Sequence, residues 1–378
     1  MLAATSFPAA EVHGQIAPMC TKYPGNPVLV PGSQNAWDNT GASFEDVIRN
    51  GSSFVMFYTG LYNNATEEIG MATSTNGVTW TKYPTPIIVP GSKGSWDSSL
   101  ASYPSVIWNG TEYLMYFTGG NSIGIAFSKD LVHWQQYANN PVLTPGPGLY
   151  DNYSISAHNV MYDPPLYKMW YSGRYSGNYT HSIGYATSSD GLHWTKYSGN
   201  PVMTRSTNND TYVGGPWGAS VVKLGSEYFA AYTNQAFVLS ATSTDGIHWT
   251  SSPKPLLLNS NQTSGLDFVI ETPSLLLVNS TLYVWYTAFP GSGSSPDVMA
   301  FAFCTLSPLV VTTTVTSTSV STILSTTTQT SVSTTTFTAV STQEVPSPAS
   351  PAYEFATIGL AALLVVVVSA SLVRRKTR

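Results

Sequence analysis

The segment Ser188-Ser-Asp-Gly-Leu-His-Trp194 has three close copies elsewhere in the chain. They are Ser74-Thr-Asn-Gly-Val-Thr-Trp80, Ser128-Lys-Asp-Leu-Val-His-Trp134 and Ser243-Thr-Asp-Gly-Ile-His-Trp249. Asp-Gly and Asn-Gly suit the positive φ angles of a tight hairpin turn, and the Trp can cover that turn from the next strand. Recurrence at such intervals predicts a fold built from repeated units.

Two strand patterns precede each turn. The nearer one alternates, as in Ile183-Gly-Tyr-Ala186, and the farther one occurs five times along the chain, as in Tyr167-Lys-Met-Trp-Tyr-Ser-Gly173. With an inner strand such as Tyr103-Pro-Ser-Val-Ile107 and an outer strand after the Trp, each unit has four strands, the size of one propeller blade. We therefore predict an all-β, five-bladed β-propeller over residues 19–308.

The fifth unit stops at Ala300-Phe-Ala-Phe-Cys304 without an outer strand. Cys20-Thr-Lys-Tyr-Pro-Gly-Asn-Pro-Val28 closely matches Trp194-Thr-Lys-Tyr-Ser-Gly-Asn-Pro-Val202, so the N-terminal strand should complete the last blade and remove its open edge. Cys20 and Cys304 would then face each other on paired strands, within disulfide range. We predict a Cys20–Cys304 disulfide, with two free thiols as the alternative.

The composition indicates a ligand without strong charge. Only 9% of the residues are charged, 12% are aromatic, and the net charge is -5. Lys and Arg form no run before the C-terminus, which argues against nucleic acid as a partner. The two distant cysteines give no zinc pattern. We expect no required cofactor and no metal site, although Ca²⁺ is compatible with the sequence.

The C-terminal part has a different composition. Residues 309–352 are rich in Ser, Thr and Pro and predict a disordered, O-glycosylated stalk. Residues 353–373 contain an uncharged apolar run and predict one transmembrane helix, a buried core helix being the alternative. The basic tail at 374–378 would be cytoplasmic, which makes the propeller extracellular on a single-pass cell-membrane protein.

Two further features of the sequence bear on export of the propeller. Sequons of the type N-x-(S/T), which favour a glycosylated surface, occur at Asn50, Asn64, Asn109, Asn152, Asn178, Asn209, Asn261 and Asn279. Residues 1–18 form an N-terminal extension without a basic and apolar leader, so we expect a signal peptide upstream of Met1. The propeller is expected to be monomeric.

Three patterns resemble a known group of proteins. The turn (S/T)-x-D-G-x-x-W, the strand Y-x-M-W-Y-(S/T)-G and the entry Trp96-Asp97 before Tyr103-Pro-Ser-Val are similar to the five-bladed propellers of glycoside hydrolase families 43 and 32 and their relatives, over Cys20 to Cys304. The resemblance implies an axial pocket for carbohydrate, lined by the starts of the innermost strands. Fold alone does not fix activity.

Glycoside hydrolysis needs one carboxylic acid and one carboxylate. Glu271, before Thr272-Pro273, resembles the Glu-Gly-Pro segment that carries the general acid in family 43, although it falls in the last blade. The family's first-blade Asp-Pro, which holds the base, corresponds to Phe44-Glu45. We predict Glu271 as the acid and Asp46 or Glu45 as the base. The alternative is that these carboxylates pair with Arg or backbone amides near the axis.

Other candidates for substrate binding lie near the predicted pocket. Asp38, Asp97 and Asp151 recur one per blade, which also fits a structural device, whereas His158 and Arg174 have no counterparts in other blades. Trp37, Trp96 and Trp217 can stack on sugar rings or pack within blades.

The sequence thus favours a membrane-anchored extracellular carbohydrate-active propeller that is similar to glycoside hydrolases, and if it is an enzyme, a glycosidase. The alternative is a non-catalytic cell-surface propeller that binds carbohydrate or protein.

Overall fold

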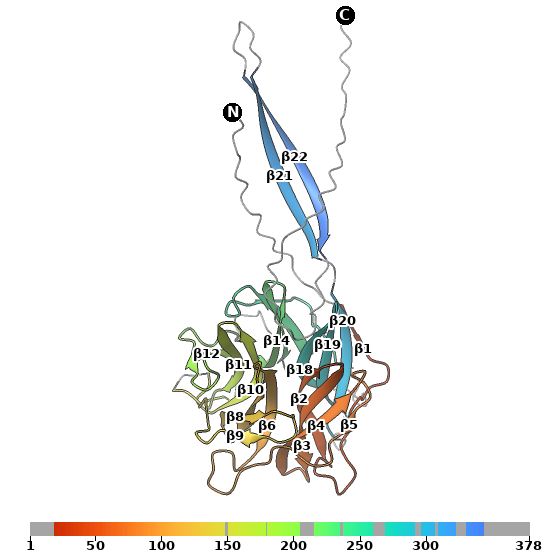
Figure 1. Ribbon diagram of the computed structural model, residues 1–378, viewed down its shortest axis with the longest axis vertical. Coiled ribbons are helices and arrows are strands. Elements are labelled where there is room, and N and C mark those ends of the chain that lie inside the picture. The colour runs from red at the N-terminus through yellow and green to blue at the C-terminus, as the bar shows by residue number, and fades with distance from the viewer. Residues whose placement is uncertain are drawn as a thin grey trace, which may run out of the picture. The chain divides into compact units, whose positions relative to one another are not determined.

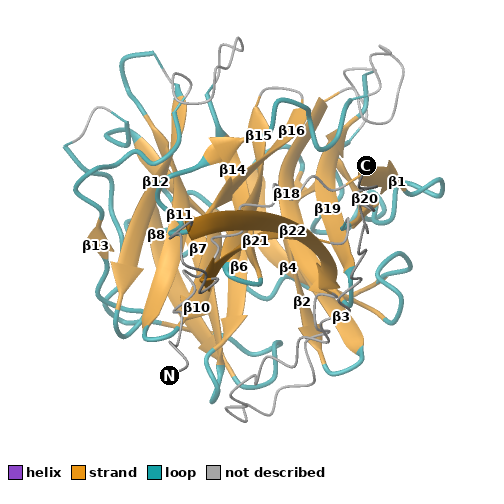
Figure 2. Ribbon diagram, turned by 90° about the horizontal axis from the view of Figure 1, so that it is seen from above, coloured by secondary structure: helices purple, strands orange, loops and turns teal. Residues whose placement is uncertain are grey.

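The computed structural model describes residues 19–147, 150–178, 180–204, 215–234, 237–259, 269–291, 296–306, 309–322 and 330–343. Residues 16–307 form one compact unit, and residues 1–15 and 308–378 form a second. All elements in the described ranges are strands (Figure 2). Within these ranges, no helix has the length and hydropathy needed to cross a bilayer.

The first unit contains five four-stranded antiparallel sheets, which we number as blades 1 to 5 in chain order of their innermost strands (Figure 1). Blade 1 consists of β2 (Gly41–Asn50), β3 (Ser53–Tyr62), β4 (Thr66–Ser74) and β5 (Thr81–Lys82). Blade 2 consists of β6 (Ala101–Trp108), β7 (Tyr113–Gly119), β8 (Ser122–Ser128) and β9 (Gln135–Gln136). The five-bladed propeller predicted from the repeats is confirmed.

The other blades follow the same order. Blade 3 consists of β10 (Ser154–Asp163), β11 (Leu166–Arg174), β12 (His181–Ser188) and β13 (Thr195–Lys196). Blade 4 consists of β14 (Trp217–Leu224), β15 (Glu227–Asn234), β16 (Phe237–Ser243) and β17 (Thr250–Ser251). Blade 5 consists of β18 (Val269–Val278), β19 (Thr281–Phe289), β20 (Val298–Thr305) and β1 (Met19–Lys22).

The repeated turn motif folds as its residues predict. The Ser188 hydroxyl accepts the Gly191 N–H at 2.9 Å, and Gly191 has φ +77°. Asp190 accepts the N–H groups of Leu192 and His193, and the Trp194 indole donates to the Gly191 carbonyl at 3.1 Å. The His193 ring is exposed and contacts the Asp190 carboxylate of its own turn, so this histidine belongs to the turn.

The second strand of each blade lies between neighbouring blades and is buried on both faces. This explains its continuous apolar run. In blades 1 and 2, a glycine near the end of this strand and a glycine of the third strand make room for an aromatic side chain: a Cβ atom on Gly60 or Gly70 would lie 2.1 or 2.2 Å from the Trp37 ring. Trp96 lies in the same way over Gly119 and Gly124.

The innermost strand of every blade has an irregular step at the same place, between Ser43 and Asp46 in blade 1. A β-bulge leaves backbone groups without a partner in their own ladder. In all five blades, the first bulge N–H donates to a Thr or Ser hydroxyl on the second strand of the preceding blade. These bonds are Phe44 N to Thr287 Oγ1 (2.9 Å), Tyr103 N to Thr59 Oγ1 (3.1 Å), Ala157 N to Thr118 Oγ1 (3.0 Å), Gly218 N to Ser172 Oγ (2.9 Å) and Thr272 N to Thr233 Oγ1 (2.7 Å).

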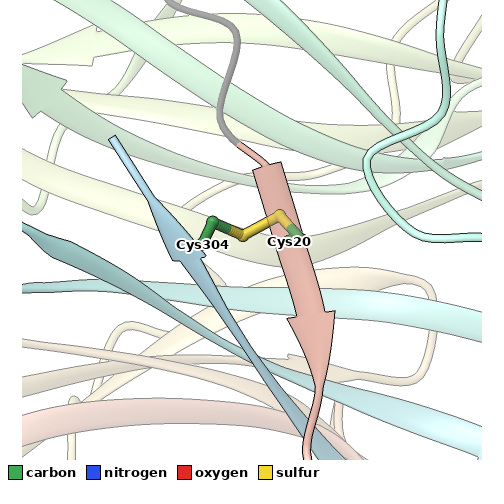
Figure 3. The surroundings of a disulfide bond; sticks show 2 residues. All are labelled: Cys20 and Cys304. Carbon is green, nitrogen blue, oxygen red and sulfur yellow. A yellow bond between two sulfur atoms is a disulfide. The ribbon is translucent and has the colours of Figure 1, made fainter. Parts of the chain in front are cut away.

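The last blade is closed by the start of the chain, as predicted. β1 pairs antiparallel with β20, with Cys20 opposite Cys304, and the two strands lie side by side in Figure 1. A disulfide joins the two cysteines (Figure 3). The N-terminal strand therefore covers the edge that blade 5 would otherwise leave open.

The second unit contains β21 (Leu309–Thr322) and β22 (Thr330–Gln343), which pair antiparallel. These strands fall within the predicted stalk, whose disorder stays a prediction. Their Thr and Val residues are β-branched, which favours extended pairing. The rest of the predicted stalk, residues 1–18 and the predicted segments 353–373 and 374–378 lie outside the described residues.

We expect replacement of Cys20 and Cys304 by Ser to lower the free energy of unfolding by about 5 kcal/mol, because the disulfide constrains a separation of 284 residues in the unfolded chain. Denaturant unfolding of the oxidised wild type and the double variant measures this difference. Thiol titration of the folded wild type without reductant should find no reactive thiol. Two reactive thiols would contradict the covalent closure of blade 5 by the Cys20–Cys304 disulfide.

Candidate functional site

Aromatic rings from four blades meet where the bulges face the propeller axis. The Phe44 and Tyr103 rings stack with centroids 4.3 Å apart, and His158 lies edge-on to Tyr103 at 5.0 Å. Trp217 lies 5.8 Å from His158 and 6.3 Å from Phe44. The structure thus brings the predicted residues His158 and Trp217 together, and it adds Phe44 and Tyr103. We call these four residues the axial aromatic cluster.

Glu271 stands immediately before the bulge of blade 5. The corresponding position in blades 1 to 3 is Ser43, Ser102 or Ser156, so Glu271 departs from the repeat. Burial, assisted by the nearby Asp297 carboxylate, raises the pKa of Glu271 to about 8. The predicted acid is therefore protonated at neutral pH.

Asp297 is a second carboxyl at this end of blade 5, and the sequence motifs did not indicate it. Its backbone carbonyl accepts the Ala42 N–H at 3.1 Å, which holds it against the innermost strand of blade 1. Burial raises the pKa of Asp297 to about 6. At neutral pH this pair therefore holds one proton, on Glu271, and one negative charge, on Asp297.

Asp297, Glu67 and His181 occupy one repeat position, at the start of the third strand, where blade 2 has Asn121. Burial raises the pKa of Glu67. His181 stacks on Trp217 at 5.6 Å, and burial together with Arg174 lowers its pKa to about 4. Aligning the third strands would have revealed this polar position, because it is neither apolar nor glycine in any of these blades.

The two residues predicted as base occupy different environments. Asp46 stands at the position of Ser105, as the alignment indicated, and accepts the Val106 N–H at 2.6 Å and the Ser274 hydroxyl at 3.4 Å. Ser105, Ser220 and Ser274 accept the equivalent N–H groups of the next blades. Asp46 is thus part of the inter-blade bonding, in line with the alternative that it pairs with a backbone amide.

Glu45 lies inside the bulge and is 6% exposed. One carboxyl oxygen accepts the Thr287 hydroxyl at 3.2 Å, and the other has no hydrogen-bond partner among the described residues. Burial raises its pKa to about 8, so it is protonated and neutral at pH 7. A neutral buried carboxyl is poorly suited to the role of a base.

The recurring Asp residues accept hydrogen bonds that stabilise their own blades. Asp38 accepts hydrogen bonds from Lys82, the Tyr58 hydroxyl at 3.0 Å and the Gly32 N–H at 3.1 Å. Asp97 receives Gln136 and Ser95, and Asp151 receives Lys196 and Tyr171. All three are at most 2% exposed. Trp37 and Trp96 likewise pack against glycines of their blades. Both observations fit the alternative that these residues stabilise the blades.

Arg174 ends β11, opposite His181, with its guanidinium 5.4 Å from the Tyr153 ring centroid. Its charge reaches the axial site, because it lowers the pKa of His181 and opposes the rise in the pKa of Tyr103. In the described part of the chain, no three His, Cys, Asp or Glu residues are grouped so that they could hold a metal ion.

The fold and the axial site lined by carboxyl and aromatic groups define a five-bladed propeller of the glycoside hydrolase type. The chain belongs to the family of the glycosyl hydrolases family 32 N-terminal domain, whose model matches residues 119–337, more than half of the chain.

Similar proteins extend this comparison. The chain is 30% identical to the uncharacterized protein Rv1502 of Mycobacterium tuberculosis over 189 residues, which are 45% of this chain and 60% of that relative. The solved structure of a thermostable family-43 glycoside hydrolase aligns with a TM-score of 0.55 at 16% identity, over 74% of this chain and 95% of that one. A solved complex of BT0996 with RGII aligns with a TM-score of 0.59 at 18% identity, over 71% of this chain and 88% of that one. At these identities the structural matches show the fold.

Substitution of Glu45 by Gln should flatten the pH dependence of stability. Its pKa is 4.5 when exposed and about 8 when folded, so the folded state keeps a proton that the unfolded chain releases. The free energy of unfolding therefore falls as pH rises through this window, by about 1.4 kcal/mol per pH unit for one such group. Urea unfolding from about pH 5 to about pH 8 measures the slope.

Glu112, in the turn between β6 and β7, supplies the control. Glu112→Gln makes the same chemical change away from the bulge and the axis, so it should retain the wild-type slope. Equal slopes for wild type and Glu45→Gln would show that Glu45 ionises normally in the folded protein.

Proposed function

We propose that this chain is a carbohydrate-active enzyme whose axial site hydrolyses a glycosidic bond, with Glu271 as the general acid. The observation that carries the proposal is the pair Glu271 and Asp297, two carboxyls at one end of the axis whose pKa values are raised to about 8 and about 6. Environments that separate two carboxyl pKa values in this way assign the acid and base roles.

The chemistry follows from the protonation states. Protonated Glu271 can donate its proton to the glycosidic oxygen as the bond to the anomeric carbon breaks. Asp297, ionised at neutral pH, can accept a proton from an attacking water or attack the anomeric carbon itself. Asp297 takes this role in place of Asp46 or Glu45, because Asp46 is bonded to the Val106 N–H and Glu45 is neutral.

The axial aromatic cluster provides the surface for the sugar. Trp217 and Tyr103 are partly exposed, and aromatic faces stack on the apolar faces of sugar rings. The similar structure of BT0996 in complex with RGII supports carbohydrate as the class of ligand.

A second candidate function is carbohydrate binding without hydrolysis. Two observations favour it: four blades contribute rings that meet at the axis, and the family's base position holds Phe44 and the neutral Glu45. Such a site can hold a sugar and lack the full catalytic set.

We further propose that the propeller is extracellular and anchored in the cell membrane by residues 353–373. The apolar run Ala356 to Val373 and the basic residues after it support this topology. The Cys20–Cys304 disulfide supports an oxidising compartment.

Glu271→Gln should lower the rate of glycoside hydrolysis at least about 100-fold, because it removes the transferable proton. The full-length chain is screened against aryl furanosides and pyranosides. Wild-type kcat/KM should rise through a pKa near that of Asp297 and fall through one near that of Glu271, at about 6 and about 8. The alkaline fall should be absent from any residual activity of the variant.

The matched control is Glu112→Gln, which makes the same chemical change at the other end of a blade and should retain full activity. Activity of Glu271→Gln equal to that of the wild type would exclude Glu271 as the acid. Sugar binding by a wild type that cleaves no substrate would exclude hydrolysis and leave the second candidate.

The membrane proposal predicts that the full-length chain, expressed with a cleavable secretion leader, sediments with membranes and resists alkaline carbonate extraction. A chain ending at residue 352 should be recovered in the soluble fraction. Equal extraction of both chains would contradict an anchor at 353–373.

A further inference from the structure

We propose that Asn26 is a positioning residue for Asp297, the carboxyl that takes the role of base or nucleophile in the proposed reaction. This inference rests on the proposed function and deepens it, because it concerns how the fold holds one of the two carboxyls of the axial site. Asn26 acts from the outer edge of blade 5, through residues 19–29 and strand β20. We call residues 19–29 the closing segment.

The side chain of Asn26 makes the two backbone hydrogen bonds that a neighbouring strand would make. Its Nδ2 donates to the Phe301 carbonyl at 2.9 Å, and its Oδ1 accepts the Phe301 N–H at 2.8 Å. The same carbonyl accepts the Tyr23 N–H at 2.9 Å. Because β1 ends at Lys22, the Asn26 side chain continues the pairing of β20 beyond the end of the outermost strand.

The contacts of the closing segment continue along β20 towards Asp297. Met299, two residues before Phe301, donates its N–H to the Leu29 carbonyl at 2.9 Å, and its own carbonyl accepts the Leu29 N–H at 3.4 Å. Asp297 immediately precedes β20 and is two residues from Met299. β19 pairs with the other edge of β20. The closing segment therefore holds the free edge of β20 up to the residues next to Asp297.

Asp297 in turn lies against blade 1. Its backbone carbonyl accepts the Ala42 N–H at 3.1 Å, and it forms an isolated bridge with Gly41. A Cβ atom on Gly41 would lie 3.7 Å from Asp297 Oδ2, so the carboxyl is beside the start of β2. The position of this carboxyl thus depends on how β20 is placed against β2. A small displacement of a catalytic group from its reactive geometry lowers the rate steeply.

Blade 2 contains a matched comparison for Asn26. Asn140 donates to the Ile125 carbonyl and accepts the Ile125 N–H, both at 2.9 Å. Ile125 lies on the third strand of blade 2, as Phe301 lies on the third strand of blade 5. At the start of that strand, blade 2 has Asn121 in place of Asp297. Of the two asparagines, only Asn26 therefore acts on a strand that begins beside a carboxyl.

The test compares the full-length wild type, Asn26→Ala and Asn140→Ala on an aryl glycoside that the wild type cleaves. Each substitution removes the same donor and the same acceptor, so the two variants should have similarly lowered Tm values. Asn26→Ala should lower kcat about 10-fold or more and change KM by less than about twofold, because it displaces Asp297 and leaves the axial aromatic cluster in place. Asn140→Ala should keep the kcat and KM of the wild type.

Hydrogen exchange gives a second measurement that needs no substrate. The Ala42 N–H donates to the Asp297 carbonyl, so its exchange rate reports whether this contact is intact. The rate should rise in Asn26→Ala and stay unchanged in Asn140→Ala. If Asn26→Ala does not fold, Asn26→Asp takes its place, because it keeps the acceptor for the Phe301 N–H and loses only the donor. It should show both effects to a smaller extent.

Two results would reduce Asn26 to a structural residue: equal losses of kcat in Asn26→Ala and Asn140→Ala, or wild-type kcat and wild-type exchange at Ala42 in Asn26→Ala. The two measurements also separate this proposal from the proposed hydrolysis. A wild type that cleaves no glycoside removes hydrolysis, and faster exchange at Ala42 in Asn26→Ala alone then still supports the hold of Asn26 on Asp297. Cleavage that depends on Glu271 and is unchanged in Asn26→Ala removes only the positioning role.

Discussion

The structure depends on one repeated hydrogen bond, from the bulge N–H of each innermost strand to a Thr or Ser hydroxyl in the preceding blade. The bulge takes this N–H out of its own ladder, and a buried N–H without a partner is costly. Each blade therefore needs its predecessor, and blade 1 needs blade 5 through Thr287. A ring of this kind is complete only when blade 5 is complete, which is what β1 and the Cys20–Cys304 disulfide achieve.

The same bulge creates the site. An extra residue in the strand redirects side chains from the blade interior to the axis, so one local irregularity supplies both the contact between blades and the lining of the axial site. Where a side chain repeats, as Ser43 and Ser102 do, it follows the scaffold. Glu271 and Trp217 depart from the repeat at that position, and we assign the proposed chemistry to such departures. The recurring Asp38, by contrast, accepts hydrogen bonds that stabilise its own blade.

The sequence predicted the fold well because its determinants are local and repeated: turn residues, glycines under aromatic rings and strands of fixed length. The N-terminal completion and the disulfide were also predictable, since Cys20 and Cys304 fall on matching repeat positions. The site was predicted only in part. Glu271 and His158 stand out in the sequence because they break the repeat, whereas Asp297 is recognisable only when the third strands are aligned. That Asp46 is bonded to Val106 depends on the stacking of two blades, which no local pattern encodes.

The buried carboxyls to which we assign the chemistry of the axial site also oppose the stability of the fold. Glu45 and Glu271 are protonated in the folded chain at pH 7 and ionised in the unfolded one, so each favours unfolding as the pH rises. One carboxyl oxygen of Glu45 has no hydrogen-bond partner among the described residues, which adds to the cost of folding. Structures keep such costs where function requires them and the surrounding fold is rigid enough to hold them. A propeller closed covalently between its first and last strands is such a scaffold, because opening the axial site requires separation of blades that the ring of hydroxyl contacts holds together.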